Sequence, residues 1–247
     1  MNYSDLVTDE SRDGLYGVYV GVVADIKDPE NMGRVKVTFP WRDAADQSRW
    51  ARIATPMAGK NMGTYFLPEK NDEVLVAFGD GDIHDPYVVG SLWNGKQKPP
   101  QKNTGKNPIR QIKSRAGHTI TFDDTDGKGA IEIETTAGQH VAIDDTKKQI
   151  LVNDAEGNSI TMSSDGVAID AKGDLSLSGK NVTIDASNNV SIGGNQISVA
   201  AKSKAALQSK GKVDIKSKGM LGLQAKGIAQ IKSSGIVKVK GAMIMLN

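Results

Sequence analysis

The last third of the chain alternates apolar and polar residues in units of eight. From residue 213 the units read VDIKSKGM, LGLQAKGI, AQIKSSGI and VKVKGAMI. Each unit contains apolar residues two positions apart, and Gly211, Gly219, Gly227 and Gly235 recur in the same register. Side chains two apart in an extended strand lie on one face, so each unit predicts one short strand followed by a turn.

A unit of eight residues cannot bury its own apolar face, so neighbouring units must stack into a shared core. Two arrangements fit this period. Three successive units of one chain can form the three faces of a solitary β-helix, or three chains can wind together and share each layer. We therefore predict a β-helical octad segment over residues 173–247, and the period by itself is compatible with either arrangement.

Upstream of the octad segment, apolar pairs recur at wider spacings of seven to eleven residues, with turn sequences such as DDTDGKG and DAEGN between them. The pairs are Ile120 and Phe122, Ile131 and Ile133, Val141 and Ile143, Ile150 and Val152, Ile160 and Met162, and Val167 and Ile169. This rhythm predicts wide β-layers over residues 116–172 that lead into the narrower octad segment.

The first part of the chain predicts a small β-barrel. Alternating, β-branched stretches predict strands at residues 15–26, 34–41, 50–54, 72–78 and 86–93. Five short strands with one long Gly- and Pro-containing connection before the fourth are typical of a closed barrel of the oligomer-binding (OB) type. The whole chain is thus predicted to be all-β.

Two stretches without apolar periodicity flank the predicted barrel at residues 15–93. Residues 1–14 are charged and predict an N-terminal arm. Residues 94–115 begin with NGKQKPPQKNTGKNP, in which proline is the sole apolar residue, and predict a linker.

Composition restricts the chemistry that is available. The 247 residues include 27 glycines and 5% aromatics but no cysteine, so disulfide bonds, thiolate ligands and cysteine nucleophiles are excluded. No apolar run is long enough to span a bilayer, and the first fourteen residues are too polar and acidic for a signal peptide. We expect the protein to be made in the cytoplasm and to leave it only through a dedicated machine.

Charge is distributed unevenly along the chain. From Lys202 onward there are ten lysines and a single acidic residue, Asp214, so this part carries a formal charge of +9 and the preceding 201 residues carry −7. Lysines on the solvent face can keep stacked strands soluble and prevent edge pairing. They can also attract anionic lipids or cell-wall polymers.

One loop contains a candidate metal-binding sequence. Asp80, Asp82, His84 and Asp85 have a spacing that can hold a divalent cation, but the twelve-residue calcium loop ends with a glutamate, and the twelfth position here is Ser91. We interpret the loop as a hairpin turn and predict no metal site.

The other acidic groups are also interpreted as structural. Asp123, Asp124 and Asp126 precede a glycine and are typical of a turn. Glu132 and Glu134 alternate with isoleucines on one strand, so both carboxylates face solvent, whereas glycosidase chemistry needs one of its two carboxylates in an apolar pocket. No phosphate loop, zinc spacing or nucleophile elbow occurs. We predict no enzymatic activity and no cofactor.

OB barrels often bind single-stranded nucleic acid on exposed aromatics in a basic groove. The predicted barrel contains Trp41, Trp50, Tyr65, Phe66 and Trp93 but no basic run. Trp41 and Trp93 are interpreted as packing or subunit-contact residues, and no nucleic-acid binding is predicted.

Several segments carry a resemblance to a known family. GRVKVTFPW, DEVLVAF, GDIHDPYVVGSLWNG, RAGHTITFDDT and the octads after GDLSLSG resemble the central spike proteins of contractile injection machines. That family includes phage baseplate assembly protein V, the valine-glycine repeat (VgrG) spikes of type VI secretion and the spikes of extracellular injection particles. The resemblance extends from about residue 15 to the end of the chain. It implies a homotrimer in which the octad segments intertwine, and a mechanical role in puncturing a membrane.

The resemblance also implies partners. VgrG chains carry a large hub domain before the barrel, and some phage spikes insert a lysozyme domain after it, but this sequence has neither. We therefore expect a separate baseplate hub protein at the N-terminal end, to which no particular residues are assigned. The histidines, His84, His118 and His140, do not form the His-x-His sequence of spikes with their own iron-bound tip.

The apolar end of the sequence is the candidate site for a tip protein. Residues 241–247 read GAMIMLN, and the family implies that they form a platform for a conical tip protein of the PAAR-repeat type. The platform residues are Met243, Ile244, Met245, Leu246 and Asn247. The alternative is that they are simply the last core layer.

The expected location follows from the family: assembly in the cytoplasm as part of a phage-tail-like particle, then delivery outside the cell or into a target cell. The sequence does not distinguish a phage, a type VI system or an extracellular particle. The competing class is a trimeric β-helical tailspike depolymerase or adhesin. Such proteins use aromatic carbohydrate-binding loops, and Phe122 is the sole aromatic residue after Trp93.

Overall fold

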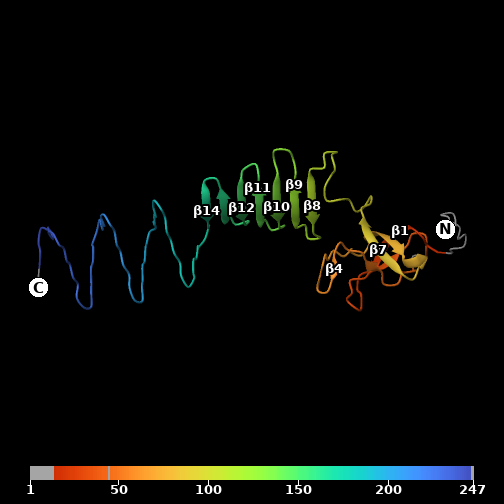
Figure 1. Ribbon diagram of the computed structural model, residues 1–247, viewed down its shortest axis with the longest axis horizontal. Helices are drawn as coiled ribbons and strands as arrows, with labels where there is room; N and C mark the ends of the chain where they lie inside the picture. Colours follow the sequence, from red (N-terminus) through yellow and green to blue (C-terminus); the bar gives the residue numbers. More distant parts are fainter. Residues whose placement is uncertain (1–13, 44, 246–247) are drawn as a thin grey trace, which may run out of the picture. The chain divides into compact units, whose positions relative to one another are not determined.

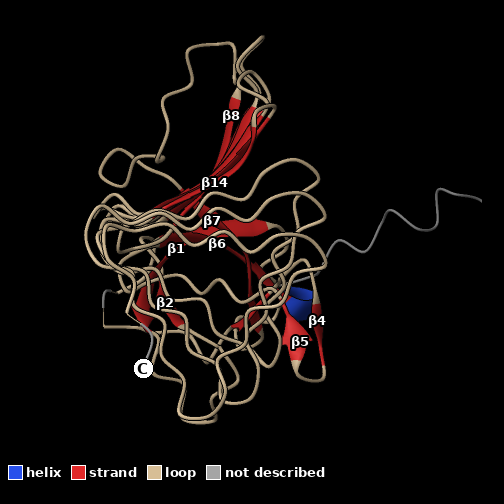
Figure 2. Ribbon diagram, turned by 90° about the vertical axis from the view of Figure 1, so that its left-hand side faces the viewer, coloured by secondary structure: helices blue, strands red, loops and turns tan. Residues whose placement is uncertain are grey.

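The computed structural model describes residues 14–43 and 45–245. It divides into two compact units, the first ending at Leu177 and the second beginning at Ser178. Residues 1–13 of the predicted arm and the last two predicted tip residues, Leu246 and Asn247, lie outside the described residues. The described part is almost entirely strand, turn and extended chain, with one short helical turn, η2 (Gly79–Gly81), so the all-β prediction is confirmed (Figure 2).

A five-stranded sheet begins the first unit (Figure 1). Its strands are β1 (Val18–Asp25), β2 (Lys36–Thr38), β3 (Arg52–Ile53), β6 (Glu73–Phe78) and β7 (Pro86–Leu92). Their order in the sheet is β2-β1-β6-β7-β3. Val35 and Ala51 exchange backbone hydrogen bonds of 3.1 and 2.7 Å beside β2 and β3. Because this bridge joins the two ends of the sheet, the five strands close into a barrel, as predicted.

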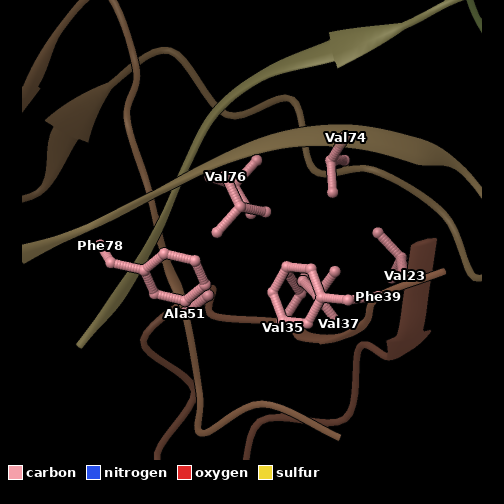
Figure 3. Packing of buried hydrophobic residues seen from close by; sticks show 9 residues of the cluster. Val23, Val35, Val37, Phe39, Ala51, Val74, Val76 and Phe78 are labelled. Carbon is pink, nitrogen blue, oxygen red and sulfur yellow. The ribbon is translucent and has the colours of Figure 1, made fainter. Parts of the chain in front are cut away.

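Alternation along these strands fills the barrel. Every second residue of β6 is buried, and these side chains meet buried residues from the other strands (Figure 3). The core consists of Val23, Val35, Val37, Phe39, Ala51, Val74, Val76, Phe78 and Val88. Each fully buried aliphatic side chain stabilises the fold by roughly 1.5–3 kcal/mol relative to exposure. Valine dominates because β-branched side chains suit the pleated surface of a strand.

Gly21 marks the tightest approach in this core. A Cβ at this position of β1 would collide with Val37 Cγ1 and would lie 3.2 Å from the Thr38 carbonyl oxygen. Gly21→Ala is therefore expected to lower the free energy of unfolding by about 1–3 kcal/mol through overpacking. Gly90→Ala on β7 is the control, because a Cβ there meets nothing within 4 Å. Urea unfolding followed by tryptophan fluorescence measures both, and equal midpoints would contradict the expectation.

The long connection of the barrel contains a small hairpin that the sequence pattern did not indicate. Strands β4 (Ala58–Gly59) and β5 (Met62–Gly63) pair antiparallel around the left-handed residue Asn61. Two-residue strands produce no apolar alternation, so the pattern in this Gly-containing stretch indicated only a loop.

The rest of the first unit contains a seven-stranded antiparallel sheet, here called the meander (Figure 1). Its strands are β8 (Ile109–Lys113), β9 (Thr119–Asp123), β10 (Ala130–Glu134), β11 (His140–Asp144), β12 (Gln149–Asn153), β13 (Ser159–Ser163) and β14 (Gly166–Asp170). Each strand pairs with its neighbour in sequence. The six predicted apolar pairs lie on β9 to β14. Strand β8 lies within residues 94–115, where we predicted a linker. The linker prediction missed it because the apolar and polar alternation around Ile112 is too short to be recognised after the polar stretch before it.

The octad segment has no paired strand within its described residues, 173–245. Those from residue 178 onward form the described part of the second unit, in which extended runs alternate with bends and the side chains are exposed. The bends recur every eight residues, at 202–203, 210–211, 218–219, 226–227 and 234–235. The eight-residue period of the sequence thus recurs in the bends of the backbone, while the strands and the intertwined β-helix stay predictions.

Candidate interaction surfaces

The meander has one face covered by two apolar rows. Residues directly opposite each other on neighbouring strands define each row. The first row is Ile112, Ile120, Ile133, Val141, Val152, Ile160 and Ile169, and the second is Phe122, Ile131, Ile143, Ile150, Met162 and Val167. Because antiparallel register repeats without a slip from β8 to β14, the thirteen side chains form a continuous surface.

These apolar side chains are not buried within one chain. Ile150 is 38% exposed, Ile160 41% and Val167 69%, and none of the thirteen belongs to the buried core. The opposite face of the meander is mainly polar. Its central row is Gln111, Thr121, Glu132, Ala142, Leu151, Thr161 and Ala168, and the rows on either side of it are mainly polar. An antiparallel sheet normally covers its apolar face. A contiguous exposed patch of this kind marks a surface for protein association.

The octad segment exposes apolar side chains in the same alternating manner. Leu175, Leu177, Val182 and Ile184 are 57–69% exposed, and Val237 and Val239 are 51% and 66% exposed. Backbone N–H and C=O groups of these extended runs have no strand partner in the described part of the segment. Both the side chains and the backbone thus offer the contacts of a β-strand to another polypeptide.

Three of the five bends between residues 202 and 235 contain the same local hydrogen bond. Ser209 Oγ accepts the N–H of Gly211 at 3.1 Å, and Ser217 Oγ accepts the N–H of Gly219 at 3.2 Å. The same bond joins Ser233 and Gly235 at 3.0 Å. Serine two residues before glycine in this pattern is a known turn-forming arrangement.

The predicted tip platform is exposed as far as the structure describes it. Met243 is 79% exposed, Ile244 53% and Met245 81%. Exposed methionines are common in surfaces that bind other proteins.

The acidic loop after β6 is a tight turn. Asp82 Oδ1 accepts the N–H of His84 at 2.8 Å, and Asp85 Oδ2 accepts the hydroxyl of Tyr87 at 2.9 Å. Asp80 has a positive φ of 48° within η2. Among the described residues there is no group of three or more His, Asp or Glu side chains placed to hold a metal ion.

The other predicted acidic residues also contact their own strands and turns. Asp123 Oδ1 accepts the N–H of Thr125 at 2.9 Å, and hydrogen bonds from Thr125 hold the pKa of this carboxyl below its ordinary value. Glu132 and Glu134 share the polar face of β10, and Glu132 Oε1 lies 3.9 Å from His140 Nε2. The two carboxylates therefore lie on a strand face and not in an apolar pocket.

The tryptophans differ in their surroundings. Trp41 packs against Phe39 and Tyr19 with ring centroids 5.3 and 5.8 Å apart, and it is 49% exposed. Trp93 is 70% exposed and lines a surface depression with Pro99. Trp41 thus packs within the barrel, which is one of the two roles proposed for it, whereas Trp93 is largely exposed and its proposed subunit contact stays a prediction.

Two features of the barrel were not predicted, and the first is a depression that Tyr65 and Phe66, already noted as barrel aromatics, line together with Met32. Met32, Tyr65 and Phe66 are 71%, 79% and 68% exposed and line one depression. The available signal was a methionine in the turn between β1 and β2 and two adjacent aromatic residues in the long connection, because both residue types are enriched in interfaces. The second feature is a buried ion pair between Asp28 and Arg34 in the turn that joins β1 and β2.

Asp28 has a side chain that is 3% exposed and accepts five hydrogen bonds. Arg34 donates from Nη2 to Oδ1 at 2.7 Å and from Nε to Oδ2 at 3.0 Å. The N–H groups of Glu30, Met32 and Arg34 supply the other three bonds. The guanidinium, followed by these N–H groups, lowers the pKa of Asp28, and the carboxylate raises that of Arg34. The turn is therefore stabilised by a charge-assisted network.

Together these surfaces define a class of protein, a small β-barrel followed by a β-rich region whose exposed apolar residues are suited to protein association. Comparison with known proteins shows what the chain resembles. Residues 19–93 match the type VI secretion system/phage-baseplate injector OB domain. The barrel is thus similar to that domain, and the resemblance of the chain to VgrG-like spike proteins is confirmed.

Curated relatives cover parts of the chain. The type VI secretion system spike protein VgrG1a of Pseudomonas aeruginosa is 33% identical over 115 residues, which are 42% of this chain and 18% of the relative. VgrG1c of the same organism is 32% identical over 141 residues, which are 48% and 19%. VgrG3 of Vibrio cholerae is 33% identical over 75 residues, which are 29% and 7%. The matched part thus spans less than a fifth of these relatives.

A search for membrane-crossing helices found none with the required length and apolar character in the part of the chain that the structure describes.

Proposed function

We propose that the chain is the central spike of a contractile injection machine of the type VI secretion or phage-baseplate kind. Three copies associate through the apolar rows of the meander and through the octad segments. The spike connects a hub protein at its N-terminal end to a tip protein of the PAAR-repeat type at its C-terminal end. It acts mechanically, by transmitting force to the membrane that it punctures.

The observation that carries this proposal is the continuous apolar surface that a single chain leaves uncovered. Thirteen side chains on seven strands, followed by apolar pairs every eight residues, need a matching surface along their whole length. A second and third copy of the same chain supply that match without any further partner. A solitary β-helix is disfavoured because octads 178–245 form no strand pairs with one another within the chain.

The same arrangement suits a mechanical role. In an intertwined trimer, each octad forms hydrogen bonds with neighbouring chains, and each bond contributes about 1 kcal/mol net. Bending or pulling apart such a rod breaks many of these bonds together. The exposed residues Met243, Ile244 and Met245 support a docking platform for the tip protein.

The test measures assembly and tip binding on the same samples. The wild-type chain is expected to have three times the mass of 26.3 kDa by light scattering and to retain a PAAR-type protein on a column. A variant with Met243→Lys and Met245→Lys is expected to keep the trimer mass and lose tip binding by more than tenfold. A monomeric wild-type chain would contradict the spike proposal, and undiminished tip binding by the variant would exclude the platform.

A further inference from the structure

The basic part of the octad segment contains a second regular feature, formed by lysines at its bends. We call Lys202, Lys210, Lys218 and Lys226 the corner lysines. Each lies in one of the bends at 202–203, 210–211, 218–219 and 226–227. All four are exposed.

Local hydrogen bonds hold the backbone at two of the four corners. The Ser209 to Gly211 and Ser217 to Gly219 bonds enclose Lys210 and Lys218. Because the backbone on both sides of the lysine is held, the ammonium group extends from a defined position and not from a freely moving loop. At these two corners the hydrogen bonds thus define where Lys210 and Lys218 leave the backbone.

The segment contains little negative charge to balance them. Asp214 is the sole acidic residue from 202 to 247, and Lys212 Nζ pairs with it at 2.6 Å while Lys216 Nζ lies at 4.0 Å. The corner lysines take no part in this pairing. Their charge is available to an external anion.

Assembly concentrates this charge, a step that rests on the proposed trimer. Stacked β-layers lie about 4.8 Å apart. In an intertwined trimer each corner receives a lysine from successive chains, so ammonium groups line up along three columns. Neighbouring charges at this distance repel each other by about 1 kcal/mol in water. A surface with closely spaced negative charges relieves that repulsion and is attracted to the columns.

We propose that the corner lysines form a binding surface for the phosphate headgroups of anionic lipids. A lysine near an anionic bilayer contributes about 1 kcal/mol of binding, so the regular columns act together. Ammonium groups cost about 2.5–3.5 kcal/mol at the centre of a bilayer. The columns therefore bind the membrane surface before penetration and do not anchor the shaft across the bilayer.

The chain offers a matched control for the test. The N-terminal part of the predicted linker contains Lys96, Lys98, Lys102 and Lys106, four lysines with no octad spacing. Replacing these four by glutamine changes the net charge as much as replacing the four corner lysines. A difference between the two variants thus reports position and not total charge.

The experiment is co-sedimentation of the full-length chain with vesicles. Phosphatidylcholine vesicles are compared with vesicles that contain phosphatidylglycerol, at low and high salt. Wild type is expected to bind the anionic vesicles only, and less strongly at high salt. The corner-lysine variant is expected to bind at least tenfold more weakly than wild type, and the linker variant within twofold of it.

Two results would overturn the inference: equal loss in the two variants, or equal binding of the wild type to both kinds of vesicle. Light scattering of each sample distinguishes failure of the lipid-binding inference from failure of the spike proposal. A wild-type chain that is not trimeric contradicts the trimer whatever the vesicles show. A wild-type trimer whose binding does not depend on the corner lysines contradicts the lipid surface and leaves the trimer in place.

Discussion

Ile160→Asp is expected to weaken assembly of the chain into trimers by more than 1,000-fold. Ile160 lies on β13 in the first apolar row, opposite Val152 and Ile169 on the neighbouring strands. In the proposed trimer it faces the other two chains. A carboxylate buried there carries an effective penalty of several kcal/mol in each chain, and every 1.4 kcal/mol corresponds to a factor of ten.

Thr161→Asp is the matched control for this prediction. Thr161 is the next residue on the same strand, but its side chain lies on the polar face between Leu151 and Ala168. The two variants introduce the same charge with the same strand propensity, so circular dichroism is expected to show similar strand content. They are expected to differ in the concentration at which the trimer dissociates during analytical ultracentrifugation.

If both variants stay trimeric down to the same dilution, the apolar rows do not form the interface between chains. If both become monomeric, the negative charge acts through the fold of the meander and not through one face. Only loss confined to Ile160→Asp supports association through the apolar rows.

Alternation made much of the fold predictable. Val74, Val76 and Phe78 on β6 are buried every second residue, as the sequence DEVLVAF indicates. The pairs of the meander were equally clear, because each strand contributes two apolar residues to one face. A repeat of two residues in the apolar pattern is a direct consequence of strand geometry, so it can be recognised in one sequence without knowing which strands pair.

The buried ion pair in the turn between β1 and β2 was harder to predict than the strands. Asp28 and Arg34 are six residues apart in a turn, and no strand period brings them together. Their contact depends on Asn31 and Gly33, which adopt positive φ values of 53° and 71°. Sequence indicated a turn at DPENMG, but the enclosure of one carboxylate by five donors is a property of the folded backbone.

Self-association lies between these two cases. The octad period predicts that strands must stack, but a period of eight serves one chain or three equally well. In the structure, octads 178–245 of one chain remain unpaired with one another. The exposed apolar side chains of these octads and of the meander together favour intertwined chains.

Asp28→Asn is expected to lower the thermal midpoint of the barrel by at least about 5 °C at pH 7. The asparagine amide removes the negative charge and directs an N–H₂ group towards donors that need an acceptor. Trp41, Trp50 and Trp93 all lie within residues 15–93, so tryptophan fluorescence reports unfolding of this part of the chain.

The same variant has a defined pH dependence. The folded-state pKa of Asp28 is lowered by Arg34 and by three backbone N–H groups. A carboxyl with a lowered folded-state pKa stabilises the fold fully above its ordinary value of about 3.9 and loses that contribution as pH falls towards the folded-state value. The difference in midpoint between wild type and Asp28→Asn is therefore expected to be constant from pH 7 to pH 5 and to shrink below pH 4.

Glu30→Gln provides the control for this second prediction. Glu30 Oε1 lies 3.1 Å from the same guanidinium, but its side chain is 69% exposed. Exposed ion pairs contribute little because water and salt screen them, so the midpoint is expected to change by less than about 2 °C. Equal effects of the two substitutions would mean that overall charge near Arg34, and not the enclosed carboxylate, stabilises the turn. A constant difference between wild type and Asp28→Asn down to pH 3 would show that the charge of Asp28 contributes nothing.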